Sequence, residues 1–175
     1  ESIGNVKLKG QHNLKNCAFV YIISKNFGVS DEEFISLLQT FRPLKHRLEY
    51  IGTKHGVEYF DDSISTTVES TINAIKSIEN VETVILGGMD RGIDYNPLIK
   101  FLLKSKLKNI ILMYESGKRI YELFQNEAGS HNKKIIYCSD LQEAAITAQN
   151  VTSKGSACLL SPASASYGHF KNFEE

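Results

Sequence analysis

Apolar and polar positions alternate in blocks from Pro43 to the end of the chain. Four short blocks are dominated by apolar residues and have strand length: 83–86, 109–114, 134–138 and 157–160. Strands that are apolar at nearly every position are usually covered on both faces, as in a parallel sheet. Segments with helical spacing of apolar residues separate these blocks, at 67–78, 95–104, 118–126 and 141–151. The alternation predicts an α/β fold, Rossmann-like and doubly wound, with a mostly parallel sheet and helices on both faces.

The first part of the chain has a different pattern, which predicts helices only. One helix is expected over 13–26 and ends at Gly28. A second begins at Ser30, where Glu33 completes a capping box, and ends before Pro43. Two short strands are then expected at 47–51 and 57–60. We therefore predict a domain boundary that divides the chain into 1–41 and 42–175.

Composition narrows the choice of partners. The 20 basic and 20 acidic residues cancel, so the charge balance gives no reason to expect nucleic acid or an anionic membrane surface. No apolar run approaches the roughly 20 residues needed to span a bilayer. The three cysteines lie far apart and suggest neither a disulfide framework nor a zinc site. We expect a cytoplasmic protein that binds small molecules, and the missing initiator Met suggests that it is a piece of a longer chain.

Three loops that follow predicted strands carry the candidate chemistry, because ligands of doubly wound sheets bind beyond the carboxyl ends of the strands. These loops are 61–67, 87–92 and 161–166. The first and third offer hydroxyls and helix N-termini to an anion, the third if Ser166 caps a helix over 167–173. The second offers Arg91 to a carboxylate. The alternatives are an ordinary N-cap, a surface turn with an internal Asp90–Arg91 pair, and a flexible loop.

Two further groups of residues are candidates for nucleotide contacts. Asn13 and Asn16 share one helical face, and two amides on one face can read an adenine edge; capping by Asn13 is the alternative. Lys45, His46 and Arg47 lie just after the predicted boundary, either near a phosphate or on a solvated surface. No phosphate-binding loop of the type Gly-x-x-x-x-Gly-Lys-Ser/Thr occurs, so the chain alone lacks a phosphate cradle.

Taken in order, these motifs resemble those of the Mur ligases over essentially the whole chain. They are Gly10-x-His12-Asn13-x-x-Asn16, His46-Arg47, Asp62-Ser63, Gly87-Gly88-x-Asp90-Arg91-Gly92, and Leu159-Leu160-Ser161-Pro162-Ala163-x-Ala165-Ser166 followed by Phe170-Lys171-Asn172-Phe173-Glu174-Glu175. The resemblance implies that 1–41 is the tail of a central ATPase domain and 42–175 a C-terminal, glutamate-binding Rossmann-like domain. It also implies that the phosphate-binding loop lies upstream and that the family normally continues past Glu175.

The resemblance is nearest to members that add D-glutamate to UDP-N-acetylmuramoyl-L-alanine through an acyl phosphate. The implied cofactors are ATP and Mg²⁺, held mainly by the absent central domain, with no metal ligands or catalytic groups in this chain. The implied partners are the small-molecule substrates, and a bacterial cytoplasmic monomer is expected. The fragment alone is expected to be inactive.

Site residues follow from the same resemblance. It puts Asn13, Asn16, His46, Arg47 and Asp62 at the nucleotide. It puts the glutamate substrate at five positions: Thr66, Arg91, Ser166, Tyr167 and Phe173. Where well-known members have Asp-Ser-Lys-Ala-Thr-Asn, this chain has Asp62-Ser63-Ile64-Ser65-Thr66-Thr67, so Ile64 replaces a lysine. A related branch with an Asp-Ser-Ile pattern includes members thought to take L-glutamate.

Three other readings remain open from the sequence. One is a Mur ligase that adds a different amino acid, or a folylpolyglutamate-type ligase; another is a relative that adds L-glutamate. The third is a non-catalytic α/β binding module. Arg91 and the Ser-Pro-Ala-x-Ala-Ser stretch favour a glutamate ligase over the first of these.

Overall fold

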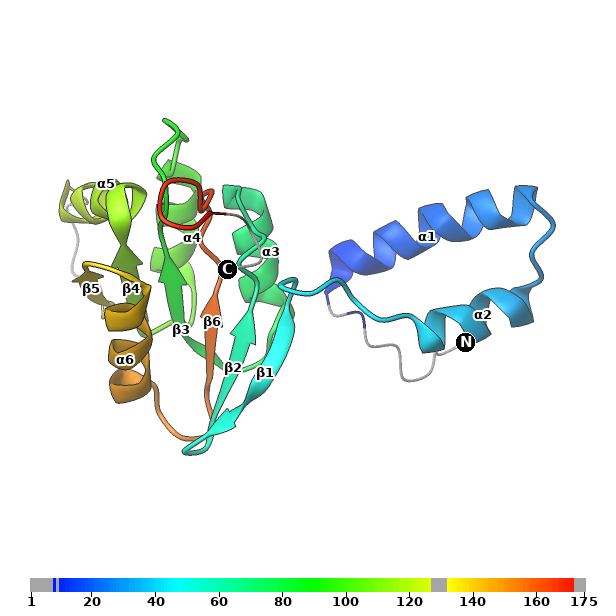
Figure 1. Ribbon diagram of the computed structural model, residues 1–175, viewed down its shortest axis with the longest axis horizontal. Coiled ribbons are helices and arrows are strands. Elements are labelled where there is room, and N and C mark those ends of the chain that lie inside the picture. The colour runs from blue at the N-terminus through cyan, green and yellow to red at the C-terminus, as the bar shows by residue number, and fades with distance from the viewer. Residues whose placement is uncertain (1–7, 9, 127–131, 172–175) are drawn as a thin grey trace. The chain divides into compact units, whose positions relative to one another are not determined.

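The computed structural model describes residues 8, 10–126 and 132–171, and the chain divides into two units, Glu1–Lys45 and His46–Glu175 (Figure 1). The sequence-based boundary after Phe41 lies a few residues before this division. Phe173, one of the expected glutamate contacts, lies outside the described residues. Each unit is described by itself.

The first unit contains helices α1 (Gln11–Asn26) and α2 (Asp31–Thr40). The predicted capping box at the start of α2 is confirmed: the Ser30 hydroxyl accepts the Glu33 N–H, and the Glu33 carboxylate accepts the Ser30 N–H. Within the described part of this unit no apolar side chain is buried. Helices gain most of their stability from packing an apolar face, and the described residues give this pair no buried apolar core of its own.

The second unit is built on one six-stranded sheet with the order β1-β2-β6-β3-β4-β5 (Figure 1). The strands are β1 (Glu49–Lys54), β2 (Val57–Asp61), β3 (Val81–Leu86), β4 (Asn109–Met113), β5 (Lys134–Cys138) and β6 (Ala157–Leu160). β1 pairs with β2 in an antiparallel hairpin, and every other pair is parallel. The predicted, mostly parallel sheet is confirmed.

Helices cover both faces of this sheet, as predicted. Helices α3 (Val68–Ser77), α4 (Asn96–Lys104) and α5 (Tyr114–Asn126) lie on one face, and α6 (Leu141–Val151) lies on the other (Figure 1). The buried apolar side chains of the first three belong to one core, and those of α6 belong to a second. Successive residues of β3 alternate between the two cores, with Val84 and Leu86 in one and Ile85 in the other. No helix within the described residues is both long and apolar enough to cross a bilayer.

Several elements begin or end one or more residues from the predicted bounds, and in β1 and α5 the difference has a clear physical cause. The first strand starts at Glu49 rather than at residue 47, because His46 and Leu48 adopt left-handed backbone conformations (φ 60° and 48°) that a strand cannot contain. Helix α5 starts at Tyr114, directly after β4, where a longer strand was expected. In both cases the chain turns sharply: at His46 and Leu48 just before β1, and at Tyr114 directly after β4.

The helix predicted over 167–173 is absent from its described part, and that prediction was wrong. Residues 166–170 form a turn in which the Ser166 carbonyl accepts the N–H groups of His169 and Phe170. Gly168 has a left-handed φ of 97°, which interrupts a right-handed helix. Tyr167, which a helix would have turned toward the core, is 63% exposed. Ser166 therefore contributes a carbonyl to a turn instead of a hydroxyl cap.

A buried carboxylate fastens the amino ends of the central strands. The Oε1 atom of Glu82 accepts the Ser153 N–H (3.0 Å) and hydroxyl (2.8 Å), and Oε2 accepts from the Ser156 hydroxyl and the Lys108 ammonium, both at 3.0 Å. Burial by itself raises the pKa of Glu82, but the hydrogen bonds from Lys108, Ser153 and Ser156 outweigh it and lower the pKa to about 2.

The Glu82 network makes stability depend on pH. Since the folded pKa of about 2 lies below the ordinary value of 4.5, the ionised form stabilises the fold above about pH 4.5, and this contribution is lost as the pH falls toward 2. We expect Glu82→Gln to lower the free energy of unfolding by about 2–3 kcal/mol near neutral pH and by much less near pH 2. Urea unfolding at both pH values measures this.

The exposed neighbour Glu79 provides the control for this experiment. Glu79→Gln should change the unfolding free energy by less than about 0.5 kcal/mol at either pH. If the cost of Glu82→Gln is the same at both pH values, the network does not hold an ionised carboxylate.

Candidate functional site

A cavity of about 190 Å³ opens at the carboxyl edge of the parallel strands, where the sequence predicts the ligand site. The loops after β2, β3 and β6 all contribute to it, together with the start of α5 and the turn at 166–170. The lining residues are His46, Asp61, Ser63, Ile64, Gly87, Gly88, Met113, Tyr114, Leu141, Leu160, Pro162, Ser164, Ala165, Ser166, His169 and Phe170. All of them belong to the second unit.

Two glycines allow the loop after β3 to touch its neighbours. A Cβ atom on Gly87 would lie 2.0 Å from the Met113 carbonyl oxygen, and one on Gly88 would lie 2.5 Å from that of Ala165. The backbone N–H of Gly87 donates to the Pro162 carbonyl at 2.9 Å. The sequence suggested that these glycines admit a backbone or a ligand, and it is neighbouring backbone that approaches them.

A chain of buried hydroxyls ties three segments together beneath the cavity. The Gly88 N–H donates to Ser116 Oγ (2.8 Å), which lies 2.7 Å from Ser164 Oγ, which in turn lies 2.8 Å from the Tyr95 hydroxyl. These side chains are almost completely buried. Neither Ser116 nor Tyr95 was singled out from the sequence, because nothing in their local sequence marks them as polar partners across the fold.

The two adjacent aspartates after β2 have different surroundings. Asp62 is only 1% exposed: it accepts the Leu48 N–H at 3.2 Å and the Ser161 hydroxyl at 2.7 Å, and burial raises its pKa. Asp61 instead lines the cavity, where its carboxylate lies 2.7 Å from His46 Nδ1. Of the two, Asp62 was the predicted nucleotide contact, and it faces protein groups.

The remaining nucleotide candidates fall in both units. His46 lines the cavity. Arg47, the next residue in the chain, is half-buried and is not among the lining residues. Asn13 and Asn16 lie in the first turns of α1, where Asn13 is buried and Asn16 is exposed. The predicted shared helical face of these two asparagines is consistent with their positions in α1.

The glutamate candidates are distributed over two of the loops and the turn. Ser166 lines the cavity, while Thr66 is half-buried just before the N-cap Thr67. Tyr167 is exposed and follows Ser166 in the turn. Ile64, at the position where the resemblance described from the sequence expects a lysine, also lines the cavity, so this part of the wall is apolar.

Arg91 is exposed on the loop after β3, and within the described residues it forms no hydrogen bond or ion pair. The alternative of an internal Asp90–Arg91 pair is not observed. Asp90 pairs with Arg119 instead (2.5 Å), and Arg119 also donates to the Ile93 carbonyl and lies over the Tyr95 ring at 5.1 Å. Arg119 thus fixes the loop and leaves the Arg91 guanidinium available.

An aromatic wall that local sequence patterns do not reveal closes the cavity beside the turn. The rings of Tyr114 and His169 stack with centroids 3.8 Å apart, and Phe170 meets Tyr114 edge-on at 6.5 Å. His169 Nε2 lies 2.8 Å from Glu115 Oε2. Tyr114 has a left-handed φ of 59°, a strained conformation of the kind that clusters at functional sites. The rule that selected the other loops, namely position directly after a strand, would have found Tyr114 if the strand had been ended at Met113.

His46, Glu49 and Asp61 form the one group of three possible metal ligands found in the part of the chain that the structure describes. Their ligand atoms lie within 4.8 Å of one another, but His46 Nδ1 already pairs with Asp61, and Glu49 Oε2 accepts the His46 N–H at 2.8 Å. Mg²⁺ prefers a shell of oxygen ligands. The group does not fit the Mg²⁺ that a nucleotide brings.

Comparisons with known proteins agree with one another. The family model described as "Mur ligase, glutamate ligase domain" matches residues 46–164. UDP-N-acetylmuramoylalanine–D-glutamate ligase of Lactobacillus acidophilus is 37% identical over 173 residues, which is 99% of this chain and 37% of the relative. The ligase of the same name from Aquifex aeolicus is 33% identical over 98% of this chain and 40% of the relative. The chain therefore spans well under half the length of these curated relatives.

Solved structures show the same fold at lower sequence identity. UDP-N-acetylmuramate–alanine ligase MurC of Thermotoga maritima has a TM-score of 0.68 at 20% identity, covering 90% of this chain and 36% of that one. MurF of Acinetobacter baumannii has a TM-score of 0.69 at 17% identity, covering 91% and 36%.

Gly87 and Gly92 provide a matched test of the close loop packing. Both have left-handed φ values, 117° and 70°, but only Gly87 has backbone atoms in the way of a Cβ. We expect Gly92→Ala to lower the unfolding free energy by about 1–2 kcal/mol, the cost of the backbone conformation alone. Gly87→Ala should cost more than about 3 kcal/mol or prevent folding. Urea unfolding followed by circular dichroism compares them, and equal costs would contradict the packing described for Gly87.

Proposed function

The chain belongs to the Mur ligase family, and on that premise we propose that it is the glutamate-binding part of an ATP-dependent ligase that adds D-glutamate to UDP-N-acetylmuramoyl-L-alanine in peptidoglycan precursor synthesis. Identity of 30–37% to D-glutamate ligases over nearly the whole chain supports this assignment. Because the chain spans only part of these relatives, the activity belongs to a longer protein.

Under this proposal, residues 1–41 are the end of the central ATPase domain and residues 42–175 the C-terminal domain. The family match over 46–164 and the division of the structure after Lys45 support it. ATP and Mg²⁺ are then bound mainly by the part of the ligase that precedes this chain. We also propose that the ligase is a cytoplasmic bacterial monomer whose partners are its small-molecule substrates.

One geometric observation carries the proposal: loops from three separate strands converge on a single cavity at the carboxyl edge of the sheet. Ser63, Gly88 and Ser166 represent the three loops in its lining. The exposed guanidinium of Arg91 stands on the middle loop. A small amino acid with two carboxylates needs hydroxyls and a cation near a confined space. Ser63 and Ser166 belong to the lining, and Arg91 is not a lining residue but stands on the loop that brings Gly87 and Gly88 to the cavity.

We assign residue roles accordingly. Arg91, Thr66, Ser166, Tyr167 and Phe173 bind glutamate, with Arg91 as the partner of a carboxylate.

A second set of residues is assigned to the nucleotide. Asn13 and Asn16 contact the adenine, and His46, Arg47 and Asp62 contribute at the nucleotide. Asp62 acts there through the loop that it holds, because its carboxylate is already hydrogen-bonded to Leu48 and Ser161.

The reaction joins an amine to a carboxylate. The carboxylate of UDP-N-acetylmuramoyl-L-alanine takes the γ-phosphoryl group of ATP, the glutamate amine attacks the acyl carbon, and the tetrahedral intermediate expels phosphate. Mg²⁺ supplies neutralisation of the polyphosphate charge. The contribution of this domain is positioning, which can lower such a barrier by as much as about 7–11 kcal/mol.

The stereochemistry of the amino acid is a separate question. The relatives reported above are named D-glutamate ligases. Ile64 lines the cavity, and Asp62-Ser63-Ile64 resembles the pattern of a branch whose members are thought to include some that take L-glutamate. We propose D-glutamate. Turnover with each enantiomer, measured as phosphate release by the complete ligase, tests the choice, and faster turnover with L-glutamate would overturn it.

Removing the Arg91 side chain tests the glutamate site. In the complete ligase, we expect Arg91→Ala to raise KM for glutamate at least about tenfold and to change KM for ATP less than about twofold, since the lost ion pair serves one substrate only. Lys104→Ala, which removes an exposed lysine at the end of α4, serves as the control and should change neither. Equal losses for glutamate and ATP would refute the role of Arg91.

The isolated chain provides a second test. We expect the purified 175-residue chain to fold but to release no phosphate with ATP, glutamate and UDP-N-acetylmuramoyl-L-alanine, because it contains no phosphate-binding loop. Circular dichroism checks folding and a phosphate assay checks turnover. Measurable turnover would show that the nucleotide site has been assigned to the wrong part of the ligase.

A further inference from the structure

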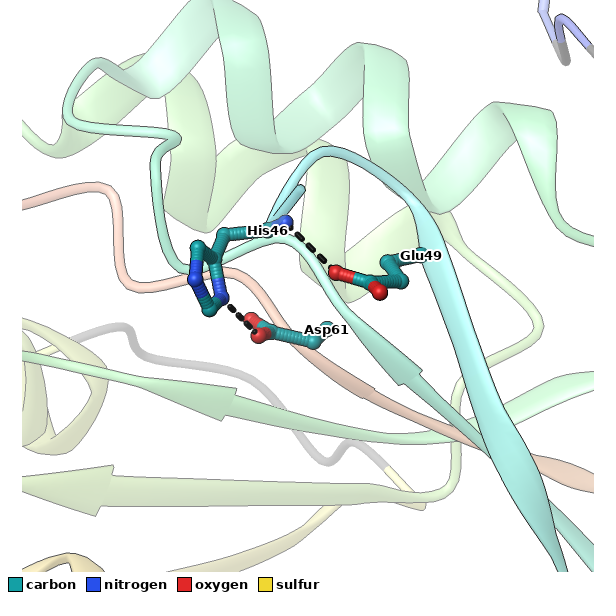
Figure 2. Close-up of side chains that lie close together, drawn as sticks. All are labelled: His46, Glu49 and Asp61. Atoms are coloured by element: carbon teal, nitrogen blue, oxygen red, sulfur yellow. Dashed lines mark hydrogen bonds and ion pairs between the residues drawn. The ribbon is translucent and has the colours of Figure 1, made fainter. Parts of the chain in front are cut away.

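His46 and Asp61 form a hydrogen-bonded pair of side chains at the cavity, in which the carboxylate orients the imidazole ring. The imidazole of His46 faces the carboxylate of Asp61 (Figure 2), with Nδ1 and Oδ2 2.7 Å apart. Both residues line the cavity. The two side chains are 31% and 18% exposed, so neither is fully solvated. A short contact between partly buried groups restricts the rotation of the imidazole ring.

The contact with Asp61 determines which nitrogen of the His46 ring carries the proton. An ionised carboxylate can only accept hydrogen bonds, so Nδ1 must be the donor to Asp61. In the neutral imidazole, Nε2 is then the acceptor. Nε2 lies on the edge of the ring away from Asp61 and forms no hydrogen bond with any described residue (Figure 2).

Hydrogen bonds that involve the backbone hold both His46 and Asp61 in place. His46 has a left-handed φ of 60°, and its N–H is held by the Glu49 carboxylate at 2.8 Å (Figure 2). Its carbonyl accepts the Ile64 N–H at 3.3 Å. Asp61 is fixed by the Ser63 N–H, which donates to its second oxygen at 2.8 Å. The ring therefore sits on a constrained turn rather than on a free loop.

We propose that Asp61 is a positioning residue that holds His46 in the Nδ1–H form, so that Nε2 accepts a hydrogen bond from a donor group of the ligand in the cavity. This deepens the proposed function and rests on it only for the identity of the ligand. The donor is an N–H or O–H group, supplied either by the amine of the amino acid or by a ribose hydroxyl of the nucleotide. A phosphate oxygen, which is an acceptor, does not suit a neutral Nε2.

Nitrogen-15 NMR of the 175-residue chain measures the ring directly. At a pH where His46 is neutral, we expect its Nδ1 signal to be that of a protonated nitrogen and its Nε2 signal that of an unprotonated one. Asp61→Ala removes the acceptor and should shift His46 toward the Nε2–H tautomer or a mixture. Glu49→Gln, which keeps an oxygen for the His46 N–H, is the matched control and should leave the tautomer unchanged.

Ligand titrations identify the donor. A shift of Nε2 on adding adenosine but not glutamate indicates the ribose hydroxyl, and the reverse indicates the amine; either result supports the proposal. Glutamate binding is followed in the same spectra through the Arg91 side chain. A chain that does not bind glutamate, which would count against the proposed function, is thereby distinguished from one that binds it without contacting His46.

Four results would overturn the proposal. The first is an Nε2–H tautomer in the unmodified chain, and the second is a tautomer that Asp61→Ala does not change. The third is no response of Nε2 to either compound. The fourth is binding of Mg²⁺ or inorganic phosphate at the ring, with loss of the Nδ1–Asp61 pair or protonation of both nitrogens.

Discussion

The buried carboxylate of Asp62 holds together the segments that form the cavity. It joins the turn at Leu48 to Ser161 at the end of β6, and the Ser161 hydroxyl lies 3.0 Å from that of Thr71 on α3. A buried carboxyl group is tolerated only when it is hydrogen-bonded in this way, and removal of one partner leaves the others unsatisfied. Asp62 therefore links the turn before β1, the end of β2 and the loop after β6, although it does not itself line the cavity.

Adjacent residues at the end of β2 thus divide two tasks between them. Because successive residues of a strand point to opposite sides, Asp62 turns into the protein and Asp61 toward the cavity. The loop after β3 repeats the division: Asp90 is held by Arg119, while Arg91 remains exposed. In both loops an anchored carboxylate stands next to a group that a ligand can reach.

The sheet, its helices and the edge that carries the cavity could be predicted because they follow from local patterns. Runs such as 83–86 and 109–114 are apolar at nearly every position, and the ends of parallel strands meet at one edge. What the sequence did not reveal depends on contacts between distant residues. The pairing of Arg119 with Asp90, the stacking of His169 on Tyr114, and the turn at Gly168 all require the tertiary fold.

Glu82 and its partners lie at the amino ends of the strands, and the cavity lies at the carboxyl ends, which form the opposite edge of the sheet. The hairpin turn at Gly56 adjoins this end too, where its carbonyl accepts the Gly155 N–H at 2.8 Å. The Glu82 network and the cavity therefore lie at opposite edges of one sheet, so the two can be altered separately. A protein engineer can graft a tag, a fluorophore or a surface tether at the 55–56 turn and leave the recognition rim untouched.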